Sequence, residues 1–230
     1  MNQSDLTLVI PAKNESESLP IVLNSLKKFN YNIIVSLHSE DTATIESIHE
    51  YKVQVVMQKK RGYGNALIDG INACKTKYFC IFNADGSFDE NDLEKMLTLN
   101  QETDFVFTSR YEKNGGSEDD TIITYIGNKF FSIFGKIFFS LNISDILYTF
   151  IMGKTESFKI LNIRSYDFRF CVELPIKMQN NNMKYYSIPS YEKKRIAGKK
   201  KVSEFKDGFL ILTEMIRLFF LKFSLSKKNI

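Results

Sequence analysis

Cysteine and histidine are scarce in this chain of 230 residues. Its three cysteines, Cys74, Cys80 and Cys171, are odd in number and show no CxxC spacing. They are therefore expected to be buried, reduced thiols rather than disulfides or zinc ligands. Only two histidines, His38 and His49, are present, so a histidine-rich metal site is not expected.

Three nucleotide-binding and hydrolase motifs are also missing. No GxGxxG follows the first apolar run, and the chain contains neither GxxxxGK followed by Ser or Thr, nor GxSxG. These absences argue against a Rossmann dinucleotide site, a P-loop and a hydrolase nucleophile elbow. The first residues are polar and lack a basic stretch before a long apolar one. No signal peptide is therefore predicted, and a cytoplasmic protein is expected.

The first half of the chain alternates strand and helix patterns. Apolar runs predict strands at 6–12, 31–37, 53–57, 77–84 and 104–109, separated by helical patterns at 15–29, 41–50, 61–75 and 89–99. Alternation of this kind predicts an α/β fold with a mostly parallel sheet flanked by helices. Ligands of such folds bind beyond the carboxyl ends of the strands. We expect one domain, with a nucleotide-binding half (1–111), an acceptor half (112–206) and a C-terminal amphipathic helix (207–230).

Two Phe-rich segments, 121–141 and 207–225, distinguish the second half. The first is almost long enough to span a bilayer. Lys129 and Lys136 are seven residues apart, which places them on one face of a helix, with Asn128 beside them. This spacing predicts an amphipathic helix, buried or interfacial, rather than a membrane span.

A basic run lies at 192–201, where six Lys and Arg residues accompany one acid. Such a run can be a solvated face, a phosphate-binding loop or a contact with an anionic membrane surface. Nucleic acid is not an expected partner, because the chain shows no nucleic-acid recognition motif.

The stretch FNADGSFDEND places Asp85 just beyond a predicted strand. Mg²⁺ typically takes one or two protein carboxylates together with phosphate oxygens, and a cation stabilises negative charge on a leaving diphosphate. Gly86 would allow the backbone to approach a ligand closely. The simpler interpretation is that Asp85 only begins a turn before the helix at 89–99.

In order, the stretches VIPAKNES, RGYGNALIDGI, FNADGSFDENDL, TSRY, GNKFF, SD and KRIAGKKKV resemble those of family 2 glycosyltransferases of the GT-A fold. The resemblance covers roughly residues 6–207. It is greatest to the polyprenyl-phosphate branch, typified by dolichyl-phosphate-mannose synthases. It implies a metal-dependent hexosyltransferase.

The resemblance also implies roles for individual residues. Nucleotide-sugar contacts fall on Pro11, Ala12, Asn14, Glu15, Ser36, Arg61, Gly62, Gly64, Asn83, Ala84 and Asp85. Asn83 and Asp85 occupy the two positions of the family's metal motif, for Mg²⁺ or Mn²⁺. Phosphate or acceptor contacts fall on Arg110, Arg195 and Lys201, and Asp145 joins Arg110 and Asp85 at the reaction centre.

Two positions depart from the family's pattern. The acid pair that usually ends the second strand is replaced by residues 36–39, SLHS, with Glu40 and Asp41 just after. Base recognition is therefore altered or moved to neighbouring residues. Asn83 keeps a carbonyl oxygen but lacks a charge, so a working, weaker metal site is expected.

The expected function is inverting transfer of a hexose from a nucleotide sugar to a membrane-anchored acceptor, polyprenyl phosphate, in cell-surface glycan synthesis. The expected location is peripheral, on the inner face of the cytoplasmic membrane; otherwise the Phe-rich faces are core or homo-oligomer contacts. Alternatives are a non-catalytic nucleotide-sugar-binding relative and a transferase for a sugar hydroxyl, with Asp145 as its base. A nucleotidyltransferase ranks lower, because residues 11–15, PAKNE, stand where its Gly-rich loop would lie.

Overall fold

The computed structural model describes residues 3–198 and 200–226; residues 227–230 of the predicted C-terminal helix lie outside that range. A seven-stranded sheet has the order β3-β2-β1-β4-β7-β5-β8, and β6 and β9 form a two-stranded sheet. The strands are β1 Leu6–Pro11, β2 Asn32–Leu37, β3 Gln54–Met57, β4 Tyr78–Ile81, β5 Phe105–Ser109, β6 Gly116–Ser117, β7 Ile151–Lys154, β8 Tyr185–Pro189 and β9 Tyr191–Glu192. The helices are η1 Gln3–Asp5, α1 Leu19–Leu26, α2 Thr42–Ser47, α3 Tyr63–Ala73, α4 Asp92–Leu99, α5 Ile122–Phe139, α6 Thr155–Leu161, α7 Phe170–Asn180 and α8 Glu204–Ser226.

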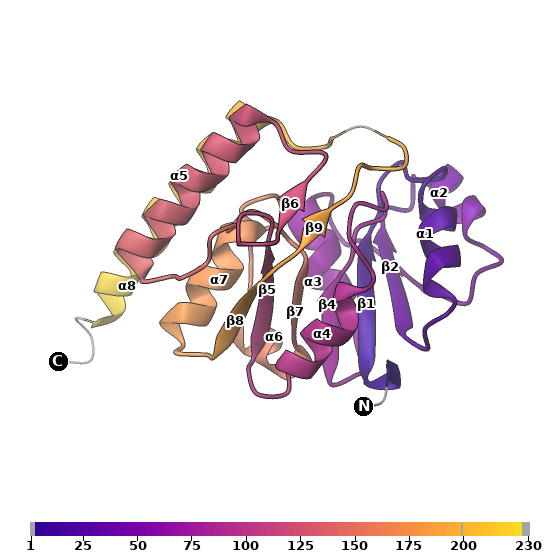
Figure 1. The fold of residues 1–230 in the computed structure, drawn as a ribbon, viewed down its shortest axis with the longest axis horizontal. Coiled ribbons are helices and arrows are strands. Elements are labelled where there is room, and N and C mark those ends of the chain that lie inside the picture. The colour runs from indigo at the N-terminus through magenta and orange to yellow at the C-terminus, as the bar shows by residue number, and fades with distance from the viewer. Residues whose placement is uncertain (1–2, 199, 227–230) are drawn as a thin grey trace.

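Helices cover both faces of the large sheet (Figure 1). Side chains alternate along β1, as strand geometry requires. Leu8 and Ile10 pack with helices α1 and α4, whereas Val9 packs on the opposite face with α3. Helix α3 lies so close to the sheet that a Cβ on Gly70 would be 2.5 Å from Val9 Cγ1. The predicted α/β fold with a mostly parallel sheet is confirmed.

Strand β7 is the exception to the parallel arrangement. It pairs antiparallel with β4 on one side and β5 on the other, so that Met152 lies opposite both Cys80 and Val106. The remaining pairs of the large sheet are parallel. The sequence predicted neither β7 nor the elements α6, α7 and β8 that follow it.

Helix α1 is shorter than the predicted 15–29. Residues 15–18 form a turn, and Pro20 stands in the first helical turn, a position that suits proline because its missing N–H has no partner there anyway. Glu15 therefore lies in the loop after β1, which lines the candidate site, and not in the helix.

Helices α5 and α8 pack against each other along one side of the molecule (Figure 1). The prediction of a helix at 121–141 is confirmed, with Thr121 forming a capping box and Ser140 ending the helix in a left-handed conformation. Only 28% of α5 is buried, and by length and mean hydropathy it could cross a membrane. Asn128 does not share the polar face of Lys129 and Lys136; it is 2% exposed and points inward.

Candidate functional site

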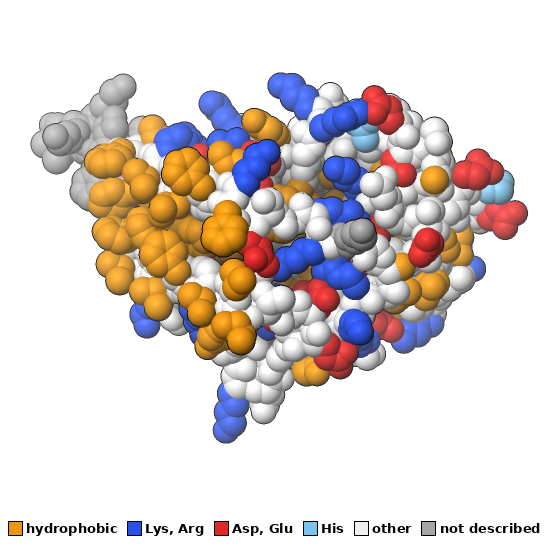
Figure 2. Space-filling view, turned by 90° about the horizontal axis from the view of Figure 1, so that it is seen from above, with side chains coloured by type: hydrophobic (Ala, Val, Ile, Leu, Met, Phe, Trp, Pro, Cys, Tyr) orange, Lys and Arg blue, Asp and Glu red, His pale blue; other side chains and the backbone are white. Residues whose placement is uncertain are grey.

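A cavity of about 1340 Å³ opens at the carboxyl ends of β1, β2, β4 and β5. Figure 2 looks onto this edge of the molecule, where charged side chains surround a hollow and apolar ones gather at one end. The wall is completed by helices α5 and α8 and by the basic run at 192–201, which is called the basic segment from here on. Of the predicted site residues, the wall contains Pro11, Ala12, Asn14, Glu15, Arg61, Gly62, Asn83, Ala84, Asp85, Arg110, Arg195 and Lys201.

The loop after β1 is fixed by residues that follow β2. Asn14 has a left-handed backbone (φ 54°), and its N–H donates to Asp41 Oδ2 at 2.7 Å. The N–H of Glu15 donates to Thr44 Oγ1 at 3.0 Å. Asp41 also caps helix α2. Asp41 and Thr44 therefore shape the loop that is expected to hold the nucleotide.

The Gly-rich turn before α3 lies against the segment between α6 and α7. Gly62 has φ +138°, and a Cβ there would lie 2.1 Å from the carbonyl oxygen of Tyr166. Glycine is therefore required by both conformation and space. Beside it, Arg61 forms an exposed ion pair with Glu40.

Asp85 and Asn83 lie on the turn after β4 and could hold a metal. Asp85 Oδ1 accepts from the Ser87 N–H at 3.0 Å, and Asp85 Oδ2 lies 3.8 Å from Arg195 Nη1. Asn83 Nδ2 donates to Ser87 Oγ at 3.1 Å. Among the described residues, nothing donates to the side-chain oxygen Asn83 Oδ1. Residues 3–198 and 200–226 contain no cluster of three or more metal-ligating side chains. The pair fits Mg²⁺ or Mn²⁺ bound jointly with phosphate oxygens, as is usual for Mg²⁺.

Arg110, directly after β5, is held by two acids and two aromatic rings. Its Nε and Nη2 donate to Asp145 Oδ2 and Oδ1 at 2.8 and 3.0 Å, and its Nη1 donates to Glu192 at 2.9 Å. The guanidinium lies 4.6 Å from the ring centre of Tyr148 and 5.2 Å from that of Tyr111. Burial lowers the pKa of Arg110, but the hydrogen bonds and charge of Asp145 outweigh it, so the pKa is raised. Arg110 therefore stays cationic.

The basic segment lies over the Asp85 turn. The N–H groups of Lys193 and Ile196 donate to the carbonyl oxygens of Ser87 and Asp85, each at 2.8 Å. Arg195 pairs with Asp119, which raises the pKa of Arg195. Lys201 pairs with Glu15. Both cations thus reach the cavity, where a diphosphate could replace their carboxylate partners; Lys199 lies outside the described residues.

Three predicted site residues do not line the cavity. Ser36 is fully buried on the α3 side of β2, 3.4 Å from where a Cβ on Gly70 would lie. Gly64 makes room for the carbonyl oxygens of Ser165 and Asp167, so its role is packing. Asp145 lies behind Arg110 with no exposed side-chain surface.

The cavity also contains residues that the sequence did not single out. Polar examples are Gln58, Asp119, Tyr148 and Glu192. The apolar group comes from α5, α8 and their neighbours, and comprises Ile123, Ile126, Phe130, Phe131, Leu147, Phe168, Phe205, Phe209, Ile211 and Leu212. Helical spacing in the Phe-rich segments was the available signal, but it does not tell which face meets the cavity.

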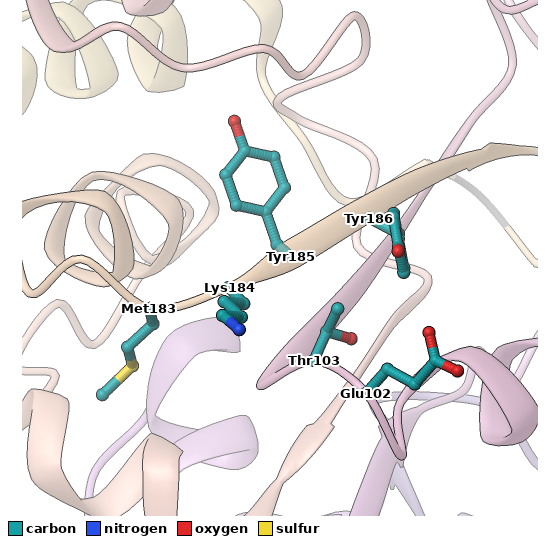
Figure 3. A pocket seen from close by; sticks show the side chains of 6 residues that line it. All are labelled: Glu102, Thr103, Met183, Lys184, Tyr185 and Tyr186. Carbon is teal, nitrogen blue, oxygen red and sulfur yellow. The ribbon is translucent and has the colours of Figure 1, made fainter.

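A smaller hollow of about 480 Å³ lies at the opposite edge of the sheet, where β5 and β8 begin. Figure 3 shows the side chains of Glu102, Lys184, Tyr185 and Tyr186 around it. None of the predicted site residues lies there. The large cavity is therefore the candidate active site.

The architecture is that of GT-A glycosyltransferases. Glucosyl-3-phosphoglycerate synthase from Mycobacterium tuberculosis is similar with a TM-score of 0.71 and 12% identity, over 93% of this chain and 79% of that one. Mannosyl-3-phosphoglycerate synthase from Rubrobacter xylanophilus gives 0.69 and 12%, over 97% and 75%. At these identities the likeness concerns the fold alone.

Residues 7–161 match glycosyl transferase family 2, and the chain belongs to that family. An uncharacterized glycosyltransferase of M. tuberculosis is 39% identical over 93 residues, which are 40% of this chain and 42% of that relative. An uncharacterized protein of Methanocaldococcus jannaschii is 28% identical over 135 residues, 56% of each chain. The chain thus matches only about half, or less, of these relatives' lengths. The expected family is confirmed, while the polyprenyl-phosphate branch remains a prediction.

Proposed function

We propose that this protein transfers a hexose from a nucleotide-sugar donor to a lipid phosphate. One observation carries the proposal. A single cavity runs from the Asp85 turn past Arg110 to an apolar wall formed by α5 and α8. The three adjoining regions match the parts of the two substrates. The Asp85 turn suits a donor diphosphate, Arg110 suits an acceptor phosphate, and the apolar wall suits an acyl or prenyl chain.

The donor end supports binding of a nucleoside diphosphate with a metal. Asp85 and Asn83 would hold Mg²⁺ or Mn²⁺, and the cation would offset the charge that develops on the leaving diphosphate. Arg195 and Lys201 would add positive charge to the same oxygens. The glucosyl-3-phosphoglycerate synthase of the same fold was crystallised with Mn²⁺ and uridine diphosphate, which supports this assignment.

The apolar wall favours a lipid acceptor over a small one. Ile126, Phe130 and Phe209 line the cavity yet leave half or more of their surface exposed. A small anion such as phosphoglycerate gains nothing from such a surface, whereas a lipid chain gains about 25 cal/mol per Å² of apolar area buried. Phosphoglycerate is the second candidate, because both structural relatives named above are phosphoglycerate glycosyl synthases.

The chemistry of a phosphate nucleophile suits this site. A phosphate monoester has a second pKa of about 6 and is largely dianionic at neutral pH, so it needs no strong general base. Asp145, which is enclosed and engaged by Arg110, then acts by orienting that cation. A hydroxyl acceptor would need a base, and Glu192 lines the cavity where Asp145 does not.

Peripheral membrane binding, on the inner face of the cytoplasmic membrane, belongs to the same proposal. The outer face of α5 presents Ile122, Ile133 and Ile137 at 79%, 56% and 68% exposure, and α8 adds Phe205 at 85%. An apolar helix face beside basic side chains is typical of interfacial helices. A homo-oligomer contact is the alternative for this surface.

A donor and acceptor screen tests the proposal. UDP- and GDP-hexoses would be incubated with Mn²⁺ and either undecaprenyl phosphate in detergent or 3-phosphoglycerate, with products detected by mass spectrometry. We expect a glycosylated lipid phosphate, and none with Asp85→Ala. Product only with 3-phosphoglycerate would replace the lipid acceptor. Tight calorimetric binding of a nucleotide sugar with no product from either acceptor would favour a non-catalytic binding protein.

A further inference from the structure

Helix α5 presents a narrow buried stripe opposite its exposed apolar face. The stripe consists of Asn128, Phe131, Ser132, Gly135 and Phe139. Asn128 is unusual among them, because an amide in a buried helical stripe must have its donor and acceptor groups satisfied or lose stability. The hydrogen-bond partners of Asn128 therefore show which groups helix α5 fixes in place.

Both halves of the Asn128 amide contact the segment after α5. Its Nδ2 donates to Asp145 Oδ1. Its Oδ1 accepts from the Leu147 N–H at 3.4 Å and from Ser132 Oγ at 3.4 Å. The Asn128 side chain is thus hydrogen-bonded both to the carboxylate of Asp145 and to the backbone N–H of Leu147.

Among the residues that the structure describes, four donors reach the Asp145 carboxylate, three of them from Arg110. Arg110 donates through its backbone N–H at 3.0 Å and through Nε at 2.8 Å to Oδ2, and through Nη2 at 3.0 Å to Oδ1. Asn128 Nδ2 is the fourth donor. Two of the four donors do not depend on the guanidinium, because the Arg110 backbone N–H holds Oδ2 and Asn128 Nδ2 holds Oδ1. Together they set the plane of the carboxylate, and the carboxylate sets the plane of the guanidinium.

We propose that Asn128 is a positioning residue that aligns Arg110 through Asp145, and so ties the orientation of this cavity cation to the seating of helix α5. The expected effect on kcat rests on the proposed function, in which Arg110 meets the acceptor phosphate. The alignment of Arg110 by Asn128 does not depend on that function. Helix α5, whose Ile126 and Phe130 line the cavity and would meet the acceptor, then also orients the group that binds the acceptor's phosphate.

A matched control is available on the same stripe. Ser132 is also buried, accepts from the Ile146 N–H at 3.1 Å and donates to Asn128 Oδ1 at 3.4 Å. Ser132→Ala therefore loosens the same helix–segment contact and removes one of the two bonds to the Asn128 oxygen, but it keeps the Asp145 donor and the Leu147 bond. Asn128→Ala removes that donor. Asn128→Leu keeps a similar size but has neither donor nor acceptor, and it serves if Asn128→Ala does not fold.

The first readout does not depend on activity. The Arg110 Nε–H signal, assigned by comparison with Arg110→Lys in a ¹⁵N spectrum, should exchange slowly with water in the wild type. We expect it to shift and to exchange faster in Asn128→Ala and Asn128→Leu, and to stay in place in Ser132→Ala. A wild-type signal in either Asn128 variant, or an equal change in Ser132→Ala, overturns the inference.

The second readout uses the donor and undecaprenyl phosphate identified by the screen. Misplacing a reacting group by about 1 Å can cost ~10²-fold in rate, so kcat of Asn128→Ala should fall by that order while KM for the donor stays unchanged. An unchanged kcat, or an equal fall in Ser132→Ala, contradicts the inference. If the wild type transfers no sugar, the proposed function fails, and the Arg110 signal still decides the role of Asn128.

Discussion

The side chain of Ile196 fills the space in which any larger residue at Gly86 would stand. A Cβ at position 86 would lie 2.4 Å from Ile196 Cδ1, and Gly86 has φ +79°. The N–H of Ile196 also donates to the carbonyl oxygen of Asp85 at 2.8 Å. These two contacts of Ile196, called the latch from here on, therefore hold the basic segment directly on the turn that carries the candidate metal ligand.

The first prediction concerns this latch. Gly86→Ala should destabilise the fold by about 1–3 kcal/mol, because alanine is strained in the left-handed region and meets Ile196. It should also weaken binding of a nucleoside diphosphate, since Arg195 would move with the segment. Thermal unfolding and calorimetry with UDP and Mn²⁺ measure both effects. Gly127→Ala, a helical position with nothing within 4 Å of its Cβ, should be neutral or stabilising; equal losses in the two variants would contradict the latch.

The second prediction concerns the metal ligands. Asp85→Ala should abolish metal-dependent transfer, because the remaining amide oxygen of Asn83 carries no charge. Asn83→Asp should keep or raise activity and tighten Mn²⁺ binding, because a second carboxylate increases attraction to the cation. Product formation against Mn²⁺ concentration is the measurement, with Glu156→Gln, which is 81% exposed and does not line the cavity, as the control. Normal turnover by Asp85→Ala would refute the metal site.

The third prediction compares two arginines of the same cavity wall. Arg110→Ala leaves the enclosed Asp145 unpaired and should cost about 3–5 kcal/mol of unfolding free energy. Arg61→Ala removes an ion pair whose side chains are 70% and 69% exposed and should cost about 0–1 kcal/mol. Urea unfolding measures both. Similar losses would mean that Asp145 is hydrated rather than enclosed.

The fourth prediction concerns acid stability. Burial raises the pKa of Glu173, but hydrogen bonds from Lys177 and Ser165 outweigh it, so the pKa lies below its usual 4.5. A carboxyl with a lowered folded pKa contributes stability that is complete above its unfolded pKa and is lost as pH falls through its folded pKa. As the pH falls below 4.5, the midpoint temperature of thermal unfolding should therefore decrease less in Glu173→Gln than in the wild type. Parallel curves for the two proteins would contradict this assignment.

The fifth prediction concerns the apolar face of α5. The wild type should float with vesicles containing phosphatidylglycerol, and less so at high salt, because screening weakens the attraction of basic side chains. A double variant, Ile133→Asp with Ile137→Asp, should remain in solution. Ile160→Asp, on helix α6 and equally exposed at 67%, should float as the wild type does. A wild type that stays in solution at both salt concentrations would leave this face as a contact between copies, visible by sedimentation.

The fold was predictable where local pattern determines structure. Buried apolar runs between helical patterns predicted β1 to β5 and the sheet edge at which the site lies. Strand β7, Ile151–Lys154, was not predicted although it is as long as β3 and β4, because it lies outside the alternation of strand and helix patterns that marks the first half of the chain. Its place between β4 and β5 depends on long-range pairing that the local sequence does not express.

The site was predictable as a set of loops but not as a set of side chains. Period-two alternation already places Ser36 on the face of Ile34, toward α3, and could have removed it from the list. Asn128 illustrates the opposite difficulty. Neighbouring residues on a helix are about 100° apart, so its position next to Lys129 indicated nothing about a shared face. Two of its partners, Asp145 and Leu147, lie 17 and 19 residues further along the chain.

The position of β7 has a consequence for the order in which the protein is made. The turn with Asp85 follows β4 and Arg110 follows β5, and the two strands are joined only through β7. On the ribosome, the candidate donor-binding loops that follow β1, β3 and β4 therefore emerge long before β7, the strand that aligns Arg110 with them. The candidate reaction centre can therefore assemble only after residues 151–154 have emerged, and its apolar wall can form only after α8 has emerged.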